Sequence, residues 1–323
     1  MVDMVTSSTH LVDGVYGRKP WQGFSMALLA AIFWGLSGVS AQWLFTVDHV
    51  MAGWLVTTRM GVSGCLILAV AAWKQGIHEL WLPWRDAKWR LQLVIFAIVG
   101  LFGVQYSYLA AIHDGNAASA TLLQYTGPSL ITVYIILRRR ERPVPRQLVA
   151  VGFSLVGTWL LVSGGRLDTL HVAFGGVAWG LLSALALAFY TLYPQDLLQR
   201  WGSGIVVGWG MLIGAAGSQL IFPVWPVSAG LGQWPAWIFI GFVVFVGTFL
   251  AFWLYLASLN FIEPGPASII TSAEPLVATL ASVAWLSVRL NVFQDIGAFS
   301  IVAAVVILSM NKKTKNKRTA VVR

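Results

Sequence analysis

The feature that most constrains this chain is a succession of ten apolar blocks, each long enough to form a membrane-spanning helix. A helix needs about 20 residues to cross the hydrocarbon core of a bilayer. The blocks cover residues 22–45, 50–72, 91–112, 117–137, 146–163, 173–193, 203–222, 235–258, 265–287 and 293–310. A transmembrane barrel would instead show short segments that alternate apolar and polar residues. We therefore predict an all-α polytopic membrane protein with ten transmembrane helices.

Composition and charge placement support this class. Hydrophobic residues make up 58% of the 323-residue chain and charged residues only 10%, which is too apolar for a soluble domain. The net charge of +9 does not indicate nucleic-acid binding, because 18 of the 21 Lys and Arg residues fall in the two tails and the even-numbered loops. Positive charge marks the cytoplasmic side of a membrane protein, so both termini are predicted to be cytoplasmic, in a bacterial-type plasma membrane. Anionic lipid headgroups are the expected partners of the basic tail.

The chain contains an internal duplication. With a shift of 147 residues, Tyr255-Leu256-Ala257 falls on Tyr108-Leu109-Ala110 and Pro275 falls on Pro128. Each copy holds five spans, an odd number, so the second copy must enter the membrane from the opposite side as an inverted repeat. The expected organisation is a disordered cytoplasmic tail (1–19), a first five-helix repeat (20–165), a second, inverted repeat (166–310) and a basic cytoplasmic tail (311–323). One chain holds the complete pair, so a monomer is expected.

These motifs resemble the EamA type of the drug/metabolite transporter superfamily. The resemblance rests on Ala30-Ala31-Ile32-Phe33-Trp34-Gly35, Arg59, Tyr108-Leu109-Ala110-Ala111, Pro128, Arg140-Glu141-Arg142, Tyr255-Leu256-Ala257 and Glu274-Pro275. It implies a ten-helix secondary transporter, often for amino-acid-like or aromatic solutes and usually working as an exporter. It also implies that Trp34 and Glu274 line the transport cavity.

Two charged residues are expected deep in the membrane. Glu274 is the only one of twelve acids in the middle of a span, and Arg59 lies at the same depth in the second span. Charges at this depth are costly unless they are paired or hydrated. Glu274 could bind a substrate amine, carry a coupling proton or neutralise Arg59. Arg59 could bond backbone carbonyls or snorkel outward, or it could pair with Glu274 or a substrate carboxylate.

Prolines at matched positions free backbone carbonyls in both halves of the chain. Pro128 frees the carbonyl of Gln124, and Pro275 frees that of Thr271, because proline has no N–H to donate four residues back. The freed carbonyls could bind an ammonium or a cation, or they could mark simple kinks repaired by hydroxyl groups or water.

Aromatic residues complete the predicted substrate site. Trp34, Tyr125, Tyr190 and Trp253 form an expected aromatic shelf, although aromatic residues at helical spacing often serve only for packing. The predicted substrate-binding residues are Trp34, Arg59, Gln124, Tyr125, Tyr190, Trp253, Thr271 and Glu274.

Function follows from these residues and from the repeat. We predict a secondary active transporter that moves a small metabolite by alternating access, with an amino acid or related zwitterion as substrate and export as direction. The alternative is uptake of choline or another quaternary ammonium compound through an aromatic box, in which cation–π contacts contribute about 2 kcal/mol. Leu187, at the position matching Trp34, weakens that alternative.

No enzyme chemistry is predicted. The single Cys65 and five scattered His residues form no nucleophile–base pair, and the sequence has no phosphate-binding GxxxxGK[ST] motif. No catalytic residue, metal or cofactor is therefore expected, and proton coupling through Glu274 is left open.

Overall fold

The computed structural model describes residues 20–139, 144–166, 172–222, 234–259, 261–262, 267 and 270–309. Within these ranges all regular secondary structure is helical. The expected tails, 1–19 and 311–323, and most of the first part of the expected ninth span lie outside the described residues.

Eight helical stretches are long and apolar enough to cross a membrane. They run over Pro20–Thr46, Ala52–Gln75, Ala87–Asp114, Ala117–Arg138, Pro145–Ser163, Phe174–Leu192, Gln195–Ile221 and Trp234–Ser258. The expected ninth and tenth spans correspond to shorter apolar helices, Glu274–Leu286 and Val292–Ile307. A polytopic helical membrane protein is thus confirmed, whereas the number of ten spans stays a prediction.

Several of these stretches are divided into shorter elements. The helices are α2 (Pro20–Thr46), α3 (Ala52–Gln75), α4 (Ile77–Leu80), α5 (Leu82–Arg85), α6 (Ala87–Ile95), α7 (Gly103–Asp114), α8 (Ala117–Gln124), α9 (Gly127–Arg139), α10 (Pro145–Ser163), α11 (Phe174–Leu192), α12 (Gln195–Ile221), α13 (Trp234–Gly241), α14 (Ala251–Ser258), α16 (Glu274–Leu286) and α17 (Val292–Ser309). Two π-helical segments, η1 (Phe96–Phe102) and η2 (Phe242–Leu250), join α6 to α7 and α13 to α14. They occupy corresponding places in the two halves of the sequence.

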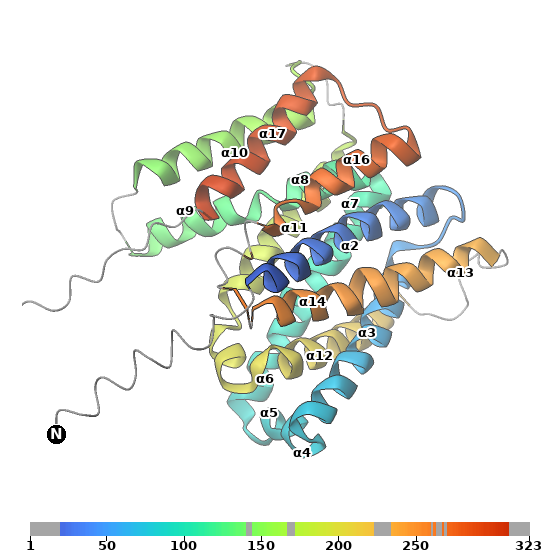
Figure 1. Ribbon diagram of the computed structural model, residues 1–323, viewed down its shortest axis with the longest axis vertical. Coiled ribbons are helices and arrows are strands. Elements are labelled where there is room, and N and C mark those ends of the chain that lie inside the picture. The colour runs from blue at the N-terminus through green and yellow to red at the C-terminus, as the bar shows by residue number, and fades with distance from the viewer. Residues whose placement is uncertain are drawn as a thin grey trace, which may run out of the picture.

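The helices pack crosswise between the two halves of the chain. α2 packs against α14 and α16, while α11 packs against α7 and α8. α3 packs against α12, and α10 lies along α17 at one side of the bundle (Figure 1). Each half therefore places its first helix on the third and fourth apolar stretches of the other half.

The N-termini of α10 and α17 are capped in the same way. The side chains of Gln147 and Gln294, which coincide under the 147-residue shift, accept hydrogen bonds from the backbone N–H groups of Val144 and Asn291 at 3.0 and 3.1 Å. Asn291 returns the bond by accepting from the N–H of Gln294 at 2.9 Å. Such reciprocal bonds satisfy donors that a helix N-terminus leaves unpaired.

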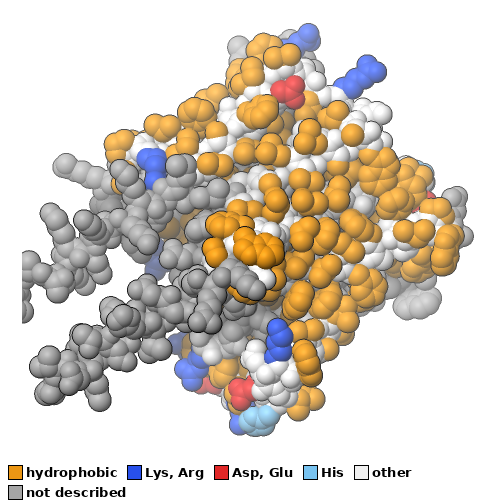
Figure 2. Space-filling model, in the orientation of Figure 1, with side chains coloured by type: hydrophobic (Ala, Val, Ile, Leu, Met, Phe, Trp, Pro, Cys, Tyr) orange, Lys and Arg blue, Asp and Glu red, His pale blue; other side chains and the backbone are white. Residues whose placement is uncertain are grey.

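α10 and α17 pack closely against each other where Gly157 faces Gly297. A Cβ atom at Gly157 or at Gly297 would lie 2.7 Å from the carbonyl oxygen of the other residue. Small residues of this kind let membrane helices approach closely. The surface of the bundle is correspondingly apolar, and hydrophobic side chains cover most of the described part of the face in Figure 2, with most charged side chains near its edges.

Candidate functional site

The stretch from α8 to α9 is broken at Tyr125 and Thr126. The N–H of Tyr125 still bonds the carbonyl of Thr121 at 3.0 Å, but the N–H of Thr126 bonds Leu123 at 3.1 Å, in the tighter i to i−3 pattern. Pro128 then supplies no N–H, so the helical ladder ends and α9 begins anew at Gly127. The break falls one turn before the proline, as the sequence predicted.

The approach to α16 is broken at the matching place. Ser272 and Ala273 form a turn, and α16 begins at Glu274, directly before Pro275. Ser272–Ala273 and Tyr125–Thr126 are related by the same 147-residue shift. Glu274 is 9% exposed and occupies the first turn of α16, where the helix dipole favours an acidic group.

Tyr125 connects the two breaks. Its hydroxyl group lies 2.7 Å from the carbonyl oxygen of Thr271 and 2.9 Å from Oε2 of Glu274. Pro275 has no backbone N–H, so it cannot donate a helical hydrogen bond to the carbonyl of Thr271. Three of the predicted site residues, from two segments far apart in the sequence, therefore meet in one hydrogen-bonded group, which we call the break contact.

Arg59 is buried but does not join this group. The guanidinium Nη2 donates to the backbone carbonyl of Gln105 at 3.2 Å and to the Gln105 side-chain oxygen. Its Nε has no partner among the described residues. In the described part of the chain the one salt bridge joins His113 and Asp114, so Arg59 does not pair with Glu274 in this conformation.

Tyr108 interacts electrostatically with both of these charged residues. It is buried, close enough to feel the charges of both Arg59 and Glu274, and its hydroxyl is 2.8 Å from that of Thr121. Gly38 of α2 leaves room for the phenol, because a Cβ atom there would lie 2.5 Å from the Tyr108 oxygen.

The other predicted residues occupy separate surroundings. Gln124 donates to Ser183 of α11 at 2.6 Å, which fastens α8 to that helix. Trp34 packs against the rings of Phe252 and Tyr255, with centroids 5.3 and 5.6 Å away.

Tyr190 and Trp253 have ring contacts of their own. Tyr190 stacks on Phe96 at 5.5 Å. Trp253 is 40% exposed, and the ammonium of Lys74 lies 5.9 Å from its ring centroid. Among the described residues, no ring contact joins any two of the four aromatic residues of the predicted shelf.

Sequence reasoning did not include Gln105, Tyr108 and Tyr255 in the site. Tyr108 and Tyr255 both begin the Tyr-Leu-Ala motif that the duplication repeats, which is a signal that could have found them. Gln105 carries no comparable signal, since its role depends on which helix faces Arg59.

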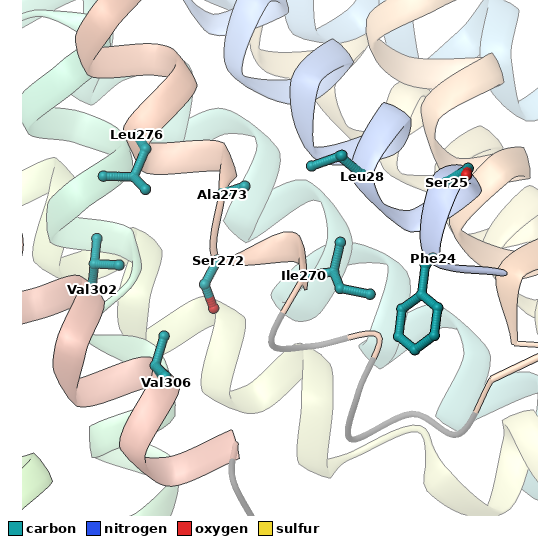
Figure 3. A pocket seen from close by; sticks show the side chains of 9 residues that line it. All are labelled: Phe24, Ser25, Leu28, Ile270, Ser272, Ala273, Leu276, Val302 and Val306. Carbon is teal, nitrogen blue, oxygen red and sulfur yellow. The ribbon is translucent and has the colours of Figure 1, made fainter. Parts of the chain in front are cut away.

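Two grooves flank the breaks on the outside of the bundle. The first, of about 480 Å³, is shown in Figure 3 and is lined by Phe24, Ser25, Leu28, Ile270, Ser272, Ala273, Leu276, Val302 and Val306. The second, of about 880 Å³, lies between α9, α10 and α11. Thr126 and Ser129 line it at positions that match Ala273 and Leu276. None of the eight predicted site residues lines either groove.

A comparison with protein families decides the class of this molecule. Residues 21–163 and 174–310 each match the family described as the EamA-like transporter family. This chain belongs to the EamA-like transporter family. The resemblance to the drug/metabolite transporter superfamily is therefore confirmed, and the protein is a transporter, not an enzyme.

Relatives of known name agree with the family. The chain is 33% identical over 296 residues to the "Uncharacterized inner membrane transporter YicL" of Salmonella typhimurium, covering 91% of this chain and 97% of the relative. It is 27% identical over 266 residues to the threonine/homoserine exporter RhtA of Escherichia coli, covering 80% and 86%. As a member of this family with several apolar spans, it is a multi-pass protein of the bacterial plasma membrane.

The fold is also shared with a solved structure. A crystal structure that is 20% identical in sequence superposes with a TM-score of 0.58, over 88% of this chain and 95% of the other. This likeness concerns the fold alone.

Proposed function

We propose that this protein is a secondary active transporter that exports an amino acid or a related zwitterion by alternating access. It acts as a monomer of ten spans, built as two inverted repeats with both termini in the cytoplasm. The observation that carries this proposal is the break contact, in which Tyr125 joins the interrupted helices of both halves at a buried acid.

Alternating access is supported by features that recur in both halves. The helix breaks and the π-helical segments lie at matched positions, and the first helix of each half packs on the other half. Interrupted helices near the middle of the bilayer form substrate and ion sites in transporters built from repeats. Exchange of the two arrangements between the halves would open the site to one side of the membrane and then to the other.

A zwitterionic substrate is supported by the two buried charges. Glu274 offers a carboxylate to an ammonium group, next to the Tyr125 hydroxyl. Arg59 offers an Nε donor without a partner among the described residues, beside Gln105. Tyr108 interacts electrostatically with both residues, and a zwitterion carries one group of the charge that suits each of them. The similarity to RhtA, a threonine/homoserine exporter, favours the same class of substrate and the same direction.

The test is uptake of labelled threonine, other labelled amino acids and labelled choline into proteoliposomes. We expect saturable amino-acid flux that Glu274→Gln abolishes and that Glu79→Gln, an exposed acid in α4, leaves unchanged. Flux of choline without flux of any amino acid would replace the proposal by its alternative. Absence of flux for every compound would show that the substrate class is wrong.

The alternative, transport of a quaternary ammonium compound, has one observation in its favour. Trp34, Phe252 and Tyr255 bring three rings together beside the break of α16. Aromatic faces attract such cations. A quaternary ammonium has no use for a guanidinium, so its flux should survive Arg59→Gln in protein that still folds, whereas amino-acid flux should not.

A further inference from the structure

The larger of the two grooves lies on the lipid-facing surface of the protein. α9 packs against both α10 and α11 and forms its floor, and α9 and α10 lie at the edge of the bundle (Figure 1). Apart from one arginine, the lining side chains that are exposed are apolar: Val133, Leu155, Trp159, Leu181 and Leu185. In a membrane-spanning segment, exposed side chains of this kind face hydrocarbon.

The polar side chains of this groove offer little to a polar ligand. The hydroxyl groups of Thr126, Thr158 and Ser163 each donate to a carbonyl three or four residues back, at 2.7, 2.8 and 2.7 Å. Ser154 is buried, and the oxygen of Ser129, which has no partner among the described residues, is buried as well. Hydrocarbon needs no hydrogen-bond partner, so these walls suit an acyl chain.

The length of the groove matches one leaflet of a bilayer. Along α10 its lining residues run from Val151 to Ser163, which spans about 18 Å at 1.5 Å per residue. On α11 they are Val177, Leu181 and Leu185, spaced by four residues and therefore on one face of the helix. Half of the hydrocarbon core of a bilayer is about 15 Å thick. The groove thus runs along the spans for the depth of one leaflet.

The one charged side chain that lines the groove is at its end. Arg166 follows α10 directly, at the end of a span, and it is exposed. No acid among the described residues forms a salt bridge with it. A guanidinium group binds phosphate oxygens through paired N–H donors. Arg166 is therefore placed where the phosphate of a lipid would lie if its acyl chain followed the groove.

We propose that this groove binds an anionic phospholipid, with one acyl chain over α9, between α10 and α11, and with the phosphate at Arg166. The lipid is anionic because no described acid lines the groove to pair with the ammonium of a zwitterionic headgroup. With cytoplasmic termini, Arg166 lies outside, so the lipid comes from the outer leaflet. This site is separate from the break contact and does not depend on what the protein transports.

The smaller groove provides an internal comparison. It lies between α2, α16 and α17, at the matching place in the other half of the chain, and its volume is about 480 Å³ against about 880 Å³ (Figure 3). Among the described residues, none that lines it is charged. We therefore expect selection of an anionic lipid by the larger groove alone.

Native mass spectrometry of the purified protein with added phosphatidylglycerol or phosphatidylethanolamine tests the headgroup site. Phosphatidylglycerol should bind more tightly, and Arg166→Gln should weaken its binding roughly fivefold. Arg166→Lys keeps the charge and should lose less. Arg289→Gln removes an exposed arginine that lines neither groove and should bind like wild type. Equal binding of the two lipids by wild type, or of phosphatidylglycerol by wild type and Arg166→Gln, would overturn the proposal.

Quenching of tryptophan fluorescence tests the path of the acyl chain. In detergent, one equivalent of phosphatidylglycerol with brominated acyl chains should quench the fluorescence of wild type, and Trp159→Phe should lose part of this quenching. Trp237→Phe removes an exposed ring of α13 that lines neither groove, and it should keep the quenching. A Trp159→Phe protein quenched as strongly as wild type would place the chain elsewhere and refute the site.

A variant that narrows the groove provides a second test of binding. Leu185→Trp adds volume inside the groove and should weaken the binding of phosphatidylglycerol. Leu182→Trp makes the same change at an exposed position of α11 that lines neither groove, and it should bind like wild type. Equal binding by these two variants would contradict the proposal. None of these measurements uses a transport substrate, so their failure would leave the proposed function standing.

Discussion

Some residues of this transporter are packed so closely that a larger side chain does not fit, and Gly38 is the clearest case. Its missing side chain provides the space for the Tyr108 hydroxyl, which in turn bonds Thr121. The phenol also interacts electrostatically with the two buried charged residues, Arg59 and Glu274. A glycine in α2 thereby sets the position of a side chain in α7.

We expect Gly38→Ala to displace Tyr108 and to lower both stability and flux. Forcing a methyl group into a packed site costs about 1–3 kcal/mol. Gly61→Ala is the matched control, because a Cβ atom there would meet only the Cβ of Ala215, at 3.7 Å. Thermal unfolding in detergent and threonine uptake would measure the two effects. Equal behaviour of the two variants would contradict the contact between Gly38 and Tyr108.

At the residue scale, sequence reasoning selected Glu274, Tyr125 and Thr271 but not the contact that joins them. Glu274 stood out because it is the only acid in the middle of a span, and Tyr125 was selected as an aromatic residue beside a predicted kink. That these two residues touch could not be predicted, since the contact depends on how two broken helices face each other. Trp253 is a different case. Its aromatic side chain suggested that it lines the cavity, but in α14 the side chain is 40% exposed.

At the scale of helices, the two prolines predicted both breaks, because a missing N–H has a local effect that the sequence alone specifies. The π-helical segments η1 and η2 could not be predicted in this way. Neither contains a proline, and within η2 the hydroxyl of Thr248 donates to the carbonyl of Val243 at 2.8 Å. Such segments depend on packing between helices, which no single stretch of sequence reveals.

The pairing of α10 with α17 gives a prediction about one interface. Gly157→Ala places a methyl group 2.7 Å from the carbonyl oxygen of Gly297, so we expect it to destabilise the protein by about 1–3 kcal/mol. Gly152→Ala, in the same helix, meets nothing within 4 Å, and it should be neutral or stabilise by up to about 1 kcal/mol. Thermal unfolding of both variants checks this difference. Similar melting temperatures would mean that the two helices do not approach so closely.

At the scale of the whole molecule, composition and charge were enough to predict a polytopic helical protein. The count of spans was harder to predict, because the break before α16 leaves a helix of 13 residues where the sequence shows one apolar block. The crosswise packing of the two halves had no sequence signal beyond the repeat itself.

The predicted orientation can be tested with two exposed positions. After replacement of the native Cys65, cysteine is introduced at Met51, between α2 and α3, or at Ile77, after α3; these side chains are 61% and 71% exposed. With cytoplasmic termini, a maleimide that cannot cross membranes should label Met51→Cys in intact cells and Ile77→Cys only after the cells are opened. The reverse pattern would place the termini outside.

The packing of α2 on α14 and α16 also has a consequence for how the protein is made. α16 leaves the ribosome roughly 230 residues after α2, and at about 5–20 residues per second this takes roughly 12–46 s. Throughout that interval α2 is present in the membrane, but the surface around Gly35 that receives the carbonyl of Glu274 has no α16 to meet. The first of the described helices to be synthesised is thus among the last to be fully packed.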